Sequence, residues 1–189
     1  MKTHTKIGLA SIAALTVAGA ASAHTGGNLA GVGAGLLHPL VGLDHLIAMF
    51  AVGLWASLAP AKKAIQGPLA FLAALVVGFG LGLGGASASF IETGIIVSLI
   101  ALGGLMLLRH KVPMAMALAL IGGFGLFHGH AHGAEATGAV GGYMVGFLAT
   151  SIALHLLGYA VGSIVSRNKY AVPAMGASVA AVGLILASA

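Results

Sequence analysis

The fold of this chain follows from residues 38–63, which read HPLVGLDHLIAMFAVGLWASLAPAKK. Residues 46–59 of this stretch carry no charge, and the apolar run ends at a proline followed closely by two lysines. An uncharged run bounded by basic residues is typical of a helix that crosses a lipid bilayer. Asp44 lies at the start of this run, beside His45 and close to His38. Because an ionisable group is costly to bury there, its presence predicts a functional role.

The composition of the whole chain is that of a membrane protein. Of its 189 residues, 59% are hydrophobic and only 6% are charged, whereas soluble domains carry about 25% charged residues. The 31 glycines agree with this class, because glycine permits close contact between membrane helices. Four of them, at alternate positions from 78 to 84, are candidates for such contacts. We therefore expect an all-α, polytopic membrane protein.

The composition also excludes several kinds of chemistry and of partner. Cysteine is absent, which rules out disulfides, thiolate metal ligands and cysteine nucleophiles. The formal net charge is +5, but the basic residues beyond position 23 lie in the gaps between apolar runs. They form no basic face, so we expect no nucleic-acid partner. The sequence does not specify an oligomeric state.

Residues 1–23 are interpreted as a cleaved signal peptide. Lys2 and Lys6 form a basic start, an apolar core follows, and residues 21–23 read ASA, which matches the small-x-small cleavage pattern. The alternative interpretation is a short first span that is retained. Cleavage would make His24 the new N-terminus and leave residues 24–189 as one domain.

Six further apolar stretches are long enough to cross a bilayer, and they predict a six-helix transmembrane bundle. The expected spans are residues 37–59, 68–86, 91–108, 112–130, 138–163 and 171–187. Basic residues occur only in alternate gaps between these spans, at Lys62, Lys63, Arg109, Lys111, Arg167 and Lys169. The positive-inside rule then places these gaps in the cytoplasm and both mature termini on the outer side.

The first span is expected to be kinked or broken near Pro39. Residues 28–37 continue the apolar pattern on its N-terminal side, so the segment is too long for one straight crossing. Proline cannot donate a backbone hydrogen bond, and it disfavours helix in the residue before it. Broken backbone at membrane depth is tolerated where it lines a cavity, and it often marks an ion site.

In this topology the polar residues gather at the outer end of the bundle. His38, Asp44 and His45 lie in the outer half of the first span, and Glu92 begins the third span. The stretch FHGHAHGAE, residues 127–135, ends the fourth span at the same side. Neutral imidazole and carboxylate are together suitable ligands for divalent nickel, cobalt, zinc, iron or manganese. We therefore predict an intramembrane metal site.

Helical spacing divides the residues of the second stretch into two groups. His128, His132 and Glu135 are spaced i, i+4 and i+7, so they share one face of a helix, whereas His130 is turned 200° away from His128. His128, His132 and Glu135 are therefore predicted ligands, and His130 is an additional candidate. A single intramembrane histidine more often forms a hydrogen bond between helices, but six such groups on three spans favour a metal site. Trp55 and Tyr143 are interpreted as anchors at the membrane interface.

These residues resemble the HupE/UreJ family of bacterial nickel/cobalt permeases. Its first motif, H-P-x-x-G-x-D-H, is matched at residues 38–45, and its second, F-H-G-x-A-H-G-x-E, at residues 127–135. A weaker similarity, E-x-x-I-x-x-S, is seen at Glu92, Ile95 and Ser98, and His155 late in the fifth span is also similar to the family. The signal peptide, the number of spans and the length fit the family too.

The resemblance implies a transporter rather than an enzyme. A permease domain, residues 24–189, is expected to carry nickel(II), or cobalt(II), across the bacterial cytoplasmic (inner) membrane to supply metalloenzymes such as hydrogenase or urease. The expected metal ligands are His38, Asp44, His45, Glu92, His128, His132 and Glu135, with His24, His130 and His155 as additional candidates. The metal ion is the transported substrate, so no permanent cofactor is expected. Nitrogen and oxygen ligands bind both metals, so the sequence does not choose between them.

Two other functions are compatible with the same residues. The first is an intramembrane zinc-dependent hydrolase, in which histidine and aspartate would bind zinc and activate a water molecule. The second is metal sensing or purely structural metal binding. Flux of the ion across a membrane would separate transport from both.

Overall fold

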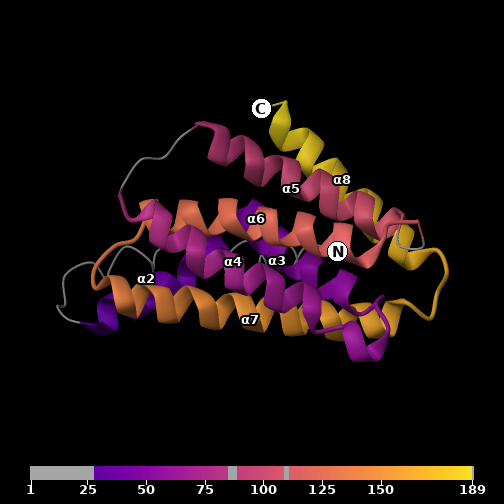
Figure 1. Ribbon diagram of the computed structural model, residues 1–189, viewed down its shortest axis with the longest axis horizontal. Helices are drawn as coiled ribbons and strands as arrows, with labels where there is room; N and C mark the ends of the chain where they lie inside the picture. Colours follow the sequence, from indigo (N-terminus) through magenta and orange to yellow (C-terminus); the bar gives the residue numbers. More distant parts are fainter. Residues whose placement is uncertain (1–27, 85–88, 109–110, 189) are drawn as a thin grey trace, which may run out of the picture.

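The computed structural model describes residues 28–84, 89–108 and 111–188, and this part of the chain is all-helical (Figure 1). Seven α-helices follow one another: α2 (Asn28–Val41), α3 (Leu43–Ala56), α4 (Gln66–Gly82), α5 (Ser89–Leu107), α6 (Met114–Ala134), α7 (Val140–Val165) and α8 (Ala171–Ala187). A short 3-10 turn, η1 (Ala61–Lys63), precedes α4. The predicted all-α class is confirmed. The predicted signal peptide and His24 lie outside the described residues.

Four of the helical segments are long and apolar enough to cross a membrane. They are Ala61–Gly82, Phe90–Leu107, Met114–Ala134 and Val140–Val165, and they coincide with the second to fifth predicted spans. The bent pair formed by α2 and α3 counts as a fifth span if its two halves cross together. α8 occupies the sixth predicted span, but its 17 residues make it a shorter apolar helix. The structure therefore supports four or five spans and a multi-pass membrane protein.

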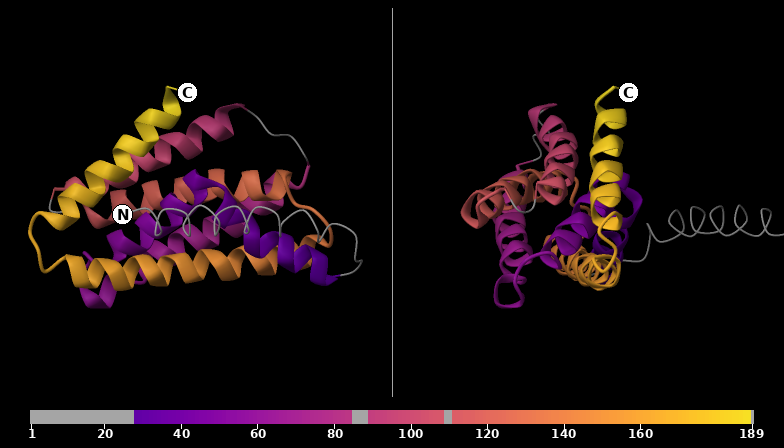
Figure 2. Two further views of the ribbon diagram at one scale, coloured as in Figure 1. Left: turned by 180° about the vertical axis from the view of Figure 1, so that it is seen from behind. Right: turned by 90° about the vertical axis from the view of Figure 1, so that its right-hand side faces the viewer.

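The seven helices pack as two pairs and one group of three that share one interior. α4 packs along α6, α2 and α3 pack on α7, and α5 packs on α8. The α5–α8 pair forms one side of the bundle in Figure 1, and Figure 2 shows from behind how α8 crosses α5. α3 and α6 also contact α5. Asp44 and His45, at the start of α3, lie beside residues of α5 and α6. This position brings polar residues of distant segments together.

Glycines set the close approach of α4 and α6. A Cβ atom at Gly129 would overlap the carbonyl group of Leu75, and one at Gly78 would overlap the carbonyl oxygen of Leu126. Gly82 has the same relation to the backbone of His130, whereas a Cβ at Gly80 or Gly84 would meet no described atom within 4 Å. The predicted contact role is thus confirmed for Gly78 and Gly82, whereas Gly80 and Gly84 make no such contact within the described part of the chain. Small residues let these two backbones approach closely.

The first segment is broken at Gly42, three residues after Pro39, so the predicted break near Pro39 is confirmed. Residues 31–41 and α3 meet at an angle of 81°, and Gly42 between them has an extended backbone with φ −75° and ψ 107°. Pro39 lies inside α2, where the helix continues because the N–H of Gly42 still donates to the carbonyl of His38 at 3.3 Å. Thr150 of α7 also donates its hydroxyl to the carbonyl of Leu36, at 2.8 Å. A proline near the end of a helix removes only one backbone hydrogen bond. α2 therefore tolerates Pro39 and ends two residues later, at Val41.

Candidate metal site

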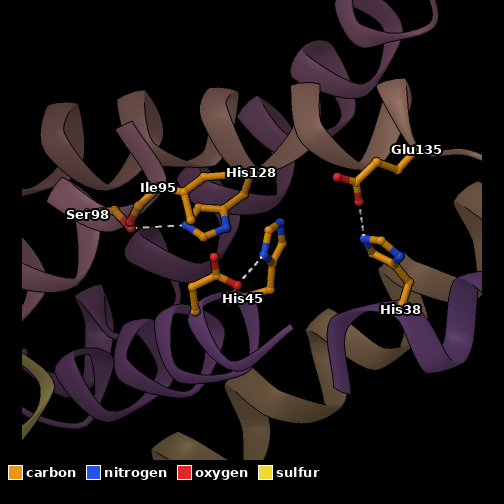
Figure 3. Close-up of polar contacts among 7 residues, drawn as sticks. His38, His45, Ile95, Ser98, His128 and Glu135 are labelled. Atoms are coloured by element: carbon orange, nitrogen blue, oxygen red, sulfur yellow. Dashed lines mark hydrogen bonds and ion pairs between the residues drawn. The ribbon is translucent and has the colours of Figure 1, made fainter. Parts of the chain in front are cut away.

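Four histidines from three helices form one contiguous cluster in the bundle. His38 comes from α2, His45 from α3, and His128 and His132 from α6. The ring centroid of His45 lies 4.7 Å from those of both His128 and His132, and the ring of His38 lies 4.9 Å from that of His132. Three of these histidines are labelled in Figure 3, where the imidazole of His45 lies beside that of His128. We refer to these four residues as the histidine cluster.

The break at Gly42 brings the two histidines of the first motif together. In a continuous helix, seven residues would separate His38 and His45 by about 10 Å along the axis. The bend of 81° reduces the distance between their ring centroids to 6.0 Å. On α6, His128 and His132 are both fully buried, as their spacing of four residues predicts. The bend and the helical stripe together build the cluster.

Two carboxylates and one hydroxyl lie within hydrogen-bond distance of imidazoles of the histidine cluster (Figure 3). Asp44 Oδ1 lies 2.8 Å from Nδ1 of His45 and also accepts the backbone N–H of His45 at 2.7 Å. Glu135 Oε2 lies 3.0 Å from Nε2 of His38. On the other side, Ser98 Oγ lies 3.0 Å from Nε2 of His128. A carboxylate that holds one ring nitrogen fixes the orientation of the imidazole and leaves its other nitrogen free for a ligand.

Several buried ring nitrogens of the histidine cluster lack a hydrogen-bond partner within the described part of the chain. They are Nε2 of His45, Nδ1 of His128 and both nitrogens of His132. Buried polar atoms are normally satisfied, since an unpaired one costs free energy. Among the described residues, however, no three His, Asp or Glu side chains are arranged to hold one ion together. Coordination of a single ion by three of them therefore requires rotation of their side chains.

All three acidic residues of the chain line one cavity beside the histidine cluster. Asp44, Glu92 and Glu135 contribute to its wall, together with His45 and His130. The cavity has a volume of about 310 Å³ and lies between α3, α5 and α6. The side chains of Glu92 and Glu135 are exposed, so it opens to the surface. A cation in this cavity would meet three carboxylates before it reaches the buried imidazoles.

The additional candidate residues have separate positions. His130 lines the acidic cavity, while its backbone packs against Gly78 and Gly82 of α4. His155 lies outside the histidine cluster, and its ring centroid is 5.4 Å from that of Phe71. The structure thus brings six of the seven predicted ligands into the cluster and its edges. The seventh, Glu92, lies across the cavity.

Residues that sequence reasoning placed elsewhere also belong to this region. Tyr143, interpreted as a membrane anchor, is only 1% exposed, and its ring centroid lies 5.7 Å from that of His38. Trp55 is buried too and packs over Gly67, so neither aromatic residue has an exposed anchor position. Ser98 and Phe147 were not predicted as site residues, although Phe147 stacks on His132 at 4.7 Å. The sequence contained one signal for Ser98, its place in the pattern E-x-x-I-x-x-S with Glu92 and Ile95.

The fold and the site define a helical membrane protein whose interior holds histidines beside an acidic cavity. A family model described as "HupE / UreJ protein" matches residues 12–186. The chain is also 40% identical over 155 residues to "Protein HupE" of Rhizobium leguminosarum bv. viciae, an alignment that covers 81% of each chain. The chain therefore belongs to the HupE/UreJ family. No solved structure shows a significant match.

Family membership assigns the protein to transmembrane metal transport in general. The family consists of transport and accessory proteins rather than enzymes, so the intramembrane hydrolase considered from the sequence is set aside. The predicted resemblance to this family is thereby confirmed over nearly the whole chain.

Proposed function

We propose that this protein carries nickel(II), or cobalt(II), into the cell through the histidine cluster. The observation that carries this proposal is the cluster itself: four imidazoles in contact, with buried nitrogens that have no partner among the described residues. Neutral imidazole is a ligand that suits both ions. A membrane protein has little reason to bury so many polar groups unless they serve a substrate.

The acidic cavity would be the outer mouth of the pathway. A divalent ion loses part of its hydration when it enters a medium of low dielectric constant, and nearby negative charge offsets part of that cost. Asp44, Glu92 and Glu135 supply this charge from three different helical segments. His130 would add one imidazole at the same level. This arrangement favours cations over anions before any imidazole is reached.

Transfer from the cavity into the histidine cluster would then exchange water for imidazole nitrogens. Asp44 holds Nδ1 of His45, so the free Nε2 of this ring is available to the ion. Glu135 lies at hydrogen-bond distance from His38 and would release this ring as the ion arrives. His132 has two free nitrogens and lies between His38 and His45 in the chain of ring contacts. Small rotations of these rings would complete the coordination shell.

The direction of transport follows from the predicted topology. Lys62, Lys63 and Lys111 lie in gaps that the positive-inside rule assigns to the cytoplasm. The acidic cavity lies at the other ends of α4, α5 and α6, and it would face the periplasm. In this arrangement both mature termini are periplasmic, in a bacterial inner membrane.

Accumulation of radionickel by intact cells tests the proposal. Cells that produce the wild-type chain should accumulate several times more nickel than cells with an empty vector, and excess cobalt should reduce this uptake. The double variant His45→Ala/His132→Ala should return uptake to the vector level at equal membrane abundance. Ser178→Ala on α8, an exposed hydroxyl that bonds only its own helix among the described residues, is the matched control. Wild-type uptake at the vector level would refute the proposal.

A further inference from the structure

A winding stripe of residues on α7 runs from the histidine cluster toward the opposite end of the bundle. Tyr143, Phe147, Ser151, His155 and Tyr159 are spaced by four residues, so the stripe rises about 6 Å and turns about 40° around the helix at each step. Its last member, Tyr159, is accordingly exposed, whereas the other four are buried. The first two contact the rings of His38 and His132, respectively. The stripe therefore continues inward from the cluster, and its fourth member is another histidine.

Phe71 of α4 contacts both that histidine and the histidine cluster. Its ring centroid lies 5.6 Å from the ring of His128 and 5.4 Å from the ring of His155. The Phe71 side chain is completely buried. The two histidines that it contacts belong to α6 and α7. A single aromatic ring thus connects two buried imidazoles by direct contact.

His155 has the features of a metal ligand. The residue is only 3% exposed, and neither nitrogen of its ring has a hydrogen-bond partner within the described ranges. It lines a second cavity of about 470 Å³, whose wall also includes Tyr159, Leu72 and Ala61. Ala61 immediately precedes Lys62 and Lys63, so this cavity lies at the basic end of the bundle.

We propose that Phe71 is a gate in the ion pathway and that His155 is a separate inner binding position for the divalent cation. This inference rests on the proposed transport function. In the observed state the Phe71 ring blocks passage from His128 to His155, and a change of its rotamer opens the passage. The ion then binds one imidazole and is released into the second cavity. Mostly apolar walls and a single imidazole make binding there weak, which passage requires, because a site that binds too tightly does not release its ion.

The first test separates binding from transport at His155. His155→Leu keeps a similar side-chain volume and breaks no hydrogen bond of the described chain, so the fold should be retained. Nickel chloride titrated into the purified variant by calorimetry should bind with wild-type affinity, because the histidine cluster is intact. Radionickel flux into proteoliposomes should nevertheless fall at least about tenfold. His155→Cys, which restores a ligand atom, should recover part of the flux.

The second test removes the gate. Phe71→Ala should speed the efflux of nickel from preloaded proteoliposomes several-fold, and Phe71→Leu should have an intermediate effect while keeping most of the buried volume. Leu99→Ala is the matched control, since Leu99 is equally buried but contacts α8 at Gly183. This control should leave the efflux rate at the wild-type value.

The outcomes distinguish this inference from the proposed function. A wild-type protein that neither binds nor transports nickel would refute the proposed function. A wild-type protein that transports nickel, together with a His155→Leu variant of equal flux, would refute the inner position alone. Efflux from the Phe71 variants that matches the Leu99→Ala control would refute the gate.

Discussion

Asp44 explains how one partly buried carboxylate can serve two purposes at the residue scale. Its Oδ1 accepts from the backbone N–H of His45 and also contacts Nδ1 of the same residue, so it supports the first turn of α3 and orients a ring. An acidic residue in the first turn of a helix also interacts favourably with the helix dipole. The same side chain lines the acidic cavity, where its charge would compensate that of a cation.

Asp44→Asn should reduce nickel uptake at least about tenfold without removing the protein from the membrane. The amide has nearly the same shape, but it carries no charge and is a weaker acceptor for the imidazole of His45. Radionickel uptake at matched membrane abundance is the measurement. Uptake above half of the wild-type value would remove this carboxylate from the mechanism.

Substitution of the histidines on the two faces of α6 should affect nickel uptake differently. His128→Ala and His132→Ala each remove a fully buried ring of the histidine cluster, so each should eliminate most uptake at limiting nickel. His130→Ala removes only a ring of the acidic cavity and should retain a large share of uptake, with a modest loss of apparent affinity. Uptake measured over a range of nickel concentrations separates these effects. Equal and severe defects in all three variants would contradict the division into two faces.

Sequence reasoning identified the histidines and carboxylates but not their pairing. Charged and polar residues are conspicuous in an apolar chain, and helical spacing alone groups His128 with His132. The contacts of Ser98 and Tyr143 depend on how α5 and α7 pack, and no local pattern in the sequence encodes that packing. A buried tyrosine and an interfacial tyrosine have the same local sequence, which explains the wrong interpretation of Tyr143.

At the scale of elements, the exact position of the break in the first segment also depends on more than the local sequence. Proline signals that a helix is near its end, but it is compatible with the last turn when neighbouring groups satisfy the backbone. The N–H that Pro39 lacks would have bonded the carbonyl of Gly35, and α2 continues past this lost bond to Val41. The sequence therefore predicted a break near Pro39, but not its exact position at Gly42.

The contact between α4 and α6 gives a prediction with an internal control. Gly129→Ala should lower the free energy of unfolding in detergent by roughly 1–3 kcal/mol, because the added methyl group would overlap the backbone of Leu75. Gly123→Ala on the same helix has open space within 4 Å among the described residues, and it should be neutral or slightly stabilising. Thermal denaturation of the two purified variants compares them directly. Equal stabilities would contradict the close packing of these helices.

At the scale of the whole molecule, transport should depend on external pH. Imidazole must be neutral to bind a metal ion, so protons compete with nickel. Apparent nickel affinity should therefore be lower at an external pH of about 5.5 than at about 7. Initial rates of uptake at a series of pH values give this affinity. A constant affinity over the range would argue against the histidine cluster as the site where nickel binds.

The architecture places all three acidic residues at one end of the bundle, and the basic residues of its described part lie in the gaps at the other end. Composition and the distribution of lysine and arginine are sufficient to predict this polarity, because both reflect the cost of charge in hydrocarbon. The number of spans is less well specified, since α8 and the bent pair of α2 and α3 are short or divided. Their final arrangement depends on contacts with α5 and α7.

The most direct test of the account is nickel flux through the purified protein alone. Radionickel uptake would be measured in proteoliposomes that contain the wild-type chain or the variant His45→Ala/His132→Ala, with cobalt and zinc as competitors and an imposed proton gradient present or absent. We expect saturable flux in the wild type, inhibition by cobalt, and no flux above protein-free vesicles in the variant. Equal flux in the wild type and the variant, or none in either, would contradict transport through the histidine cluster.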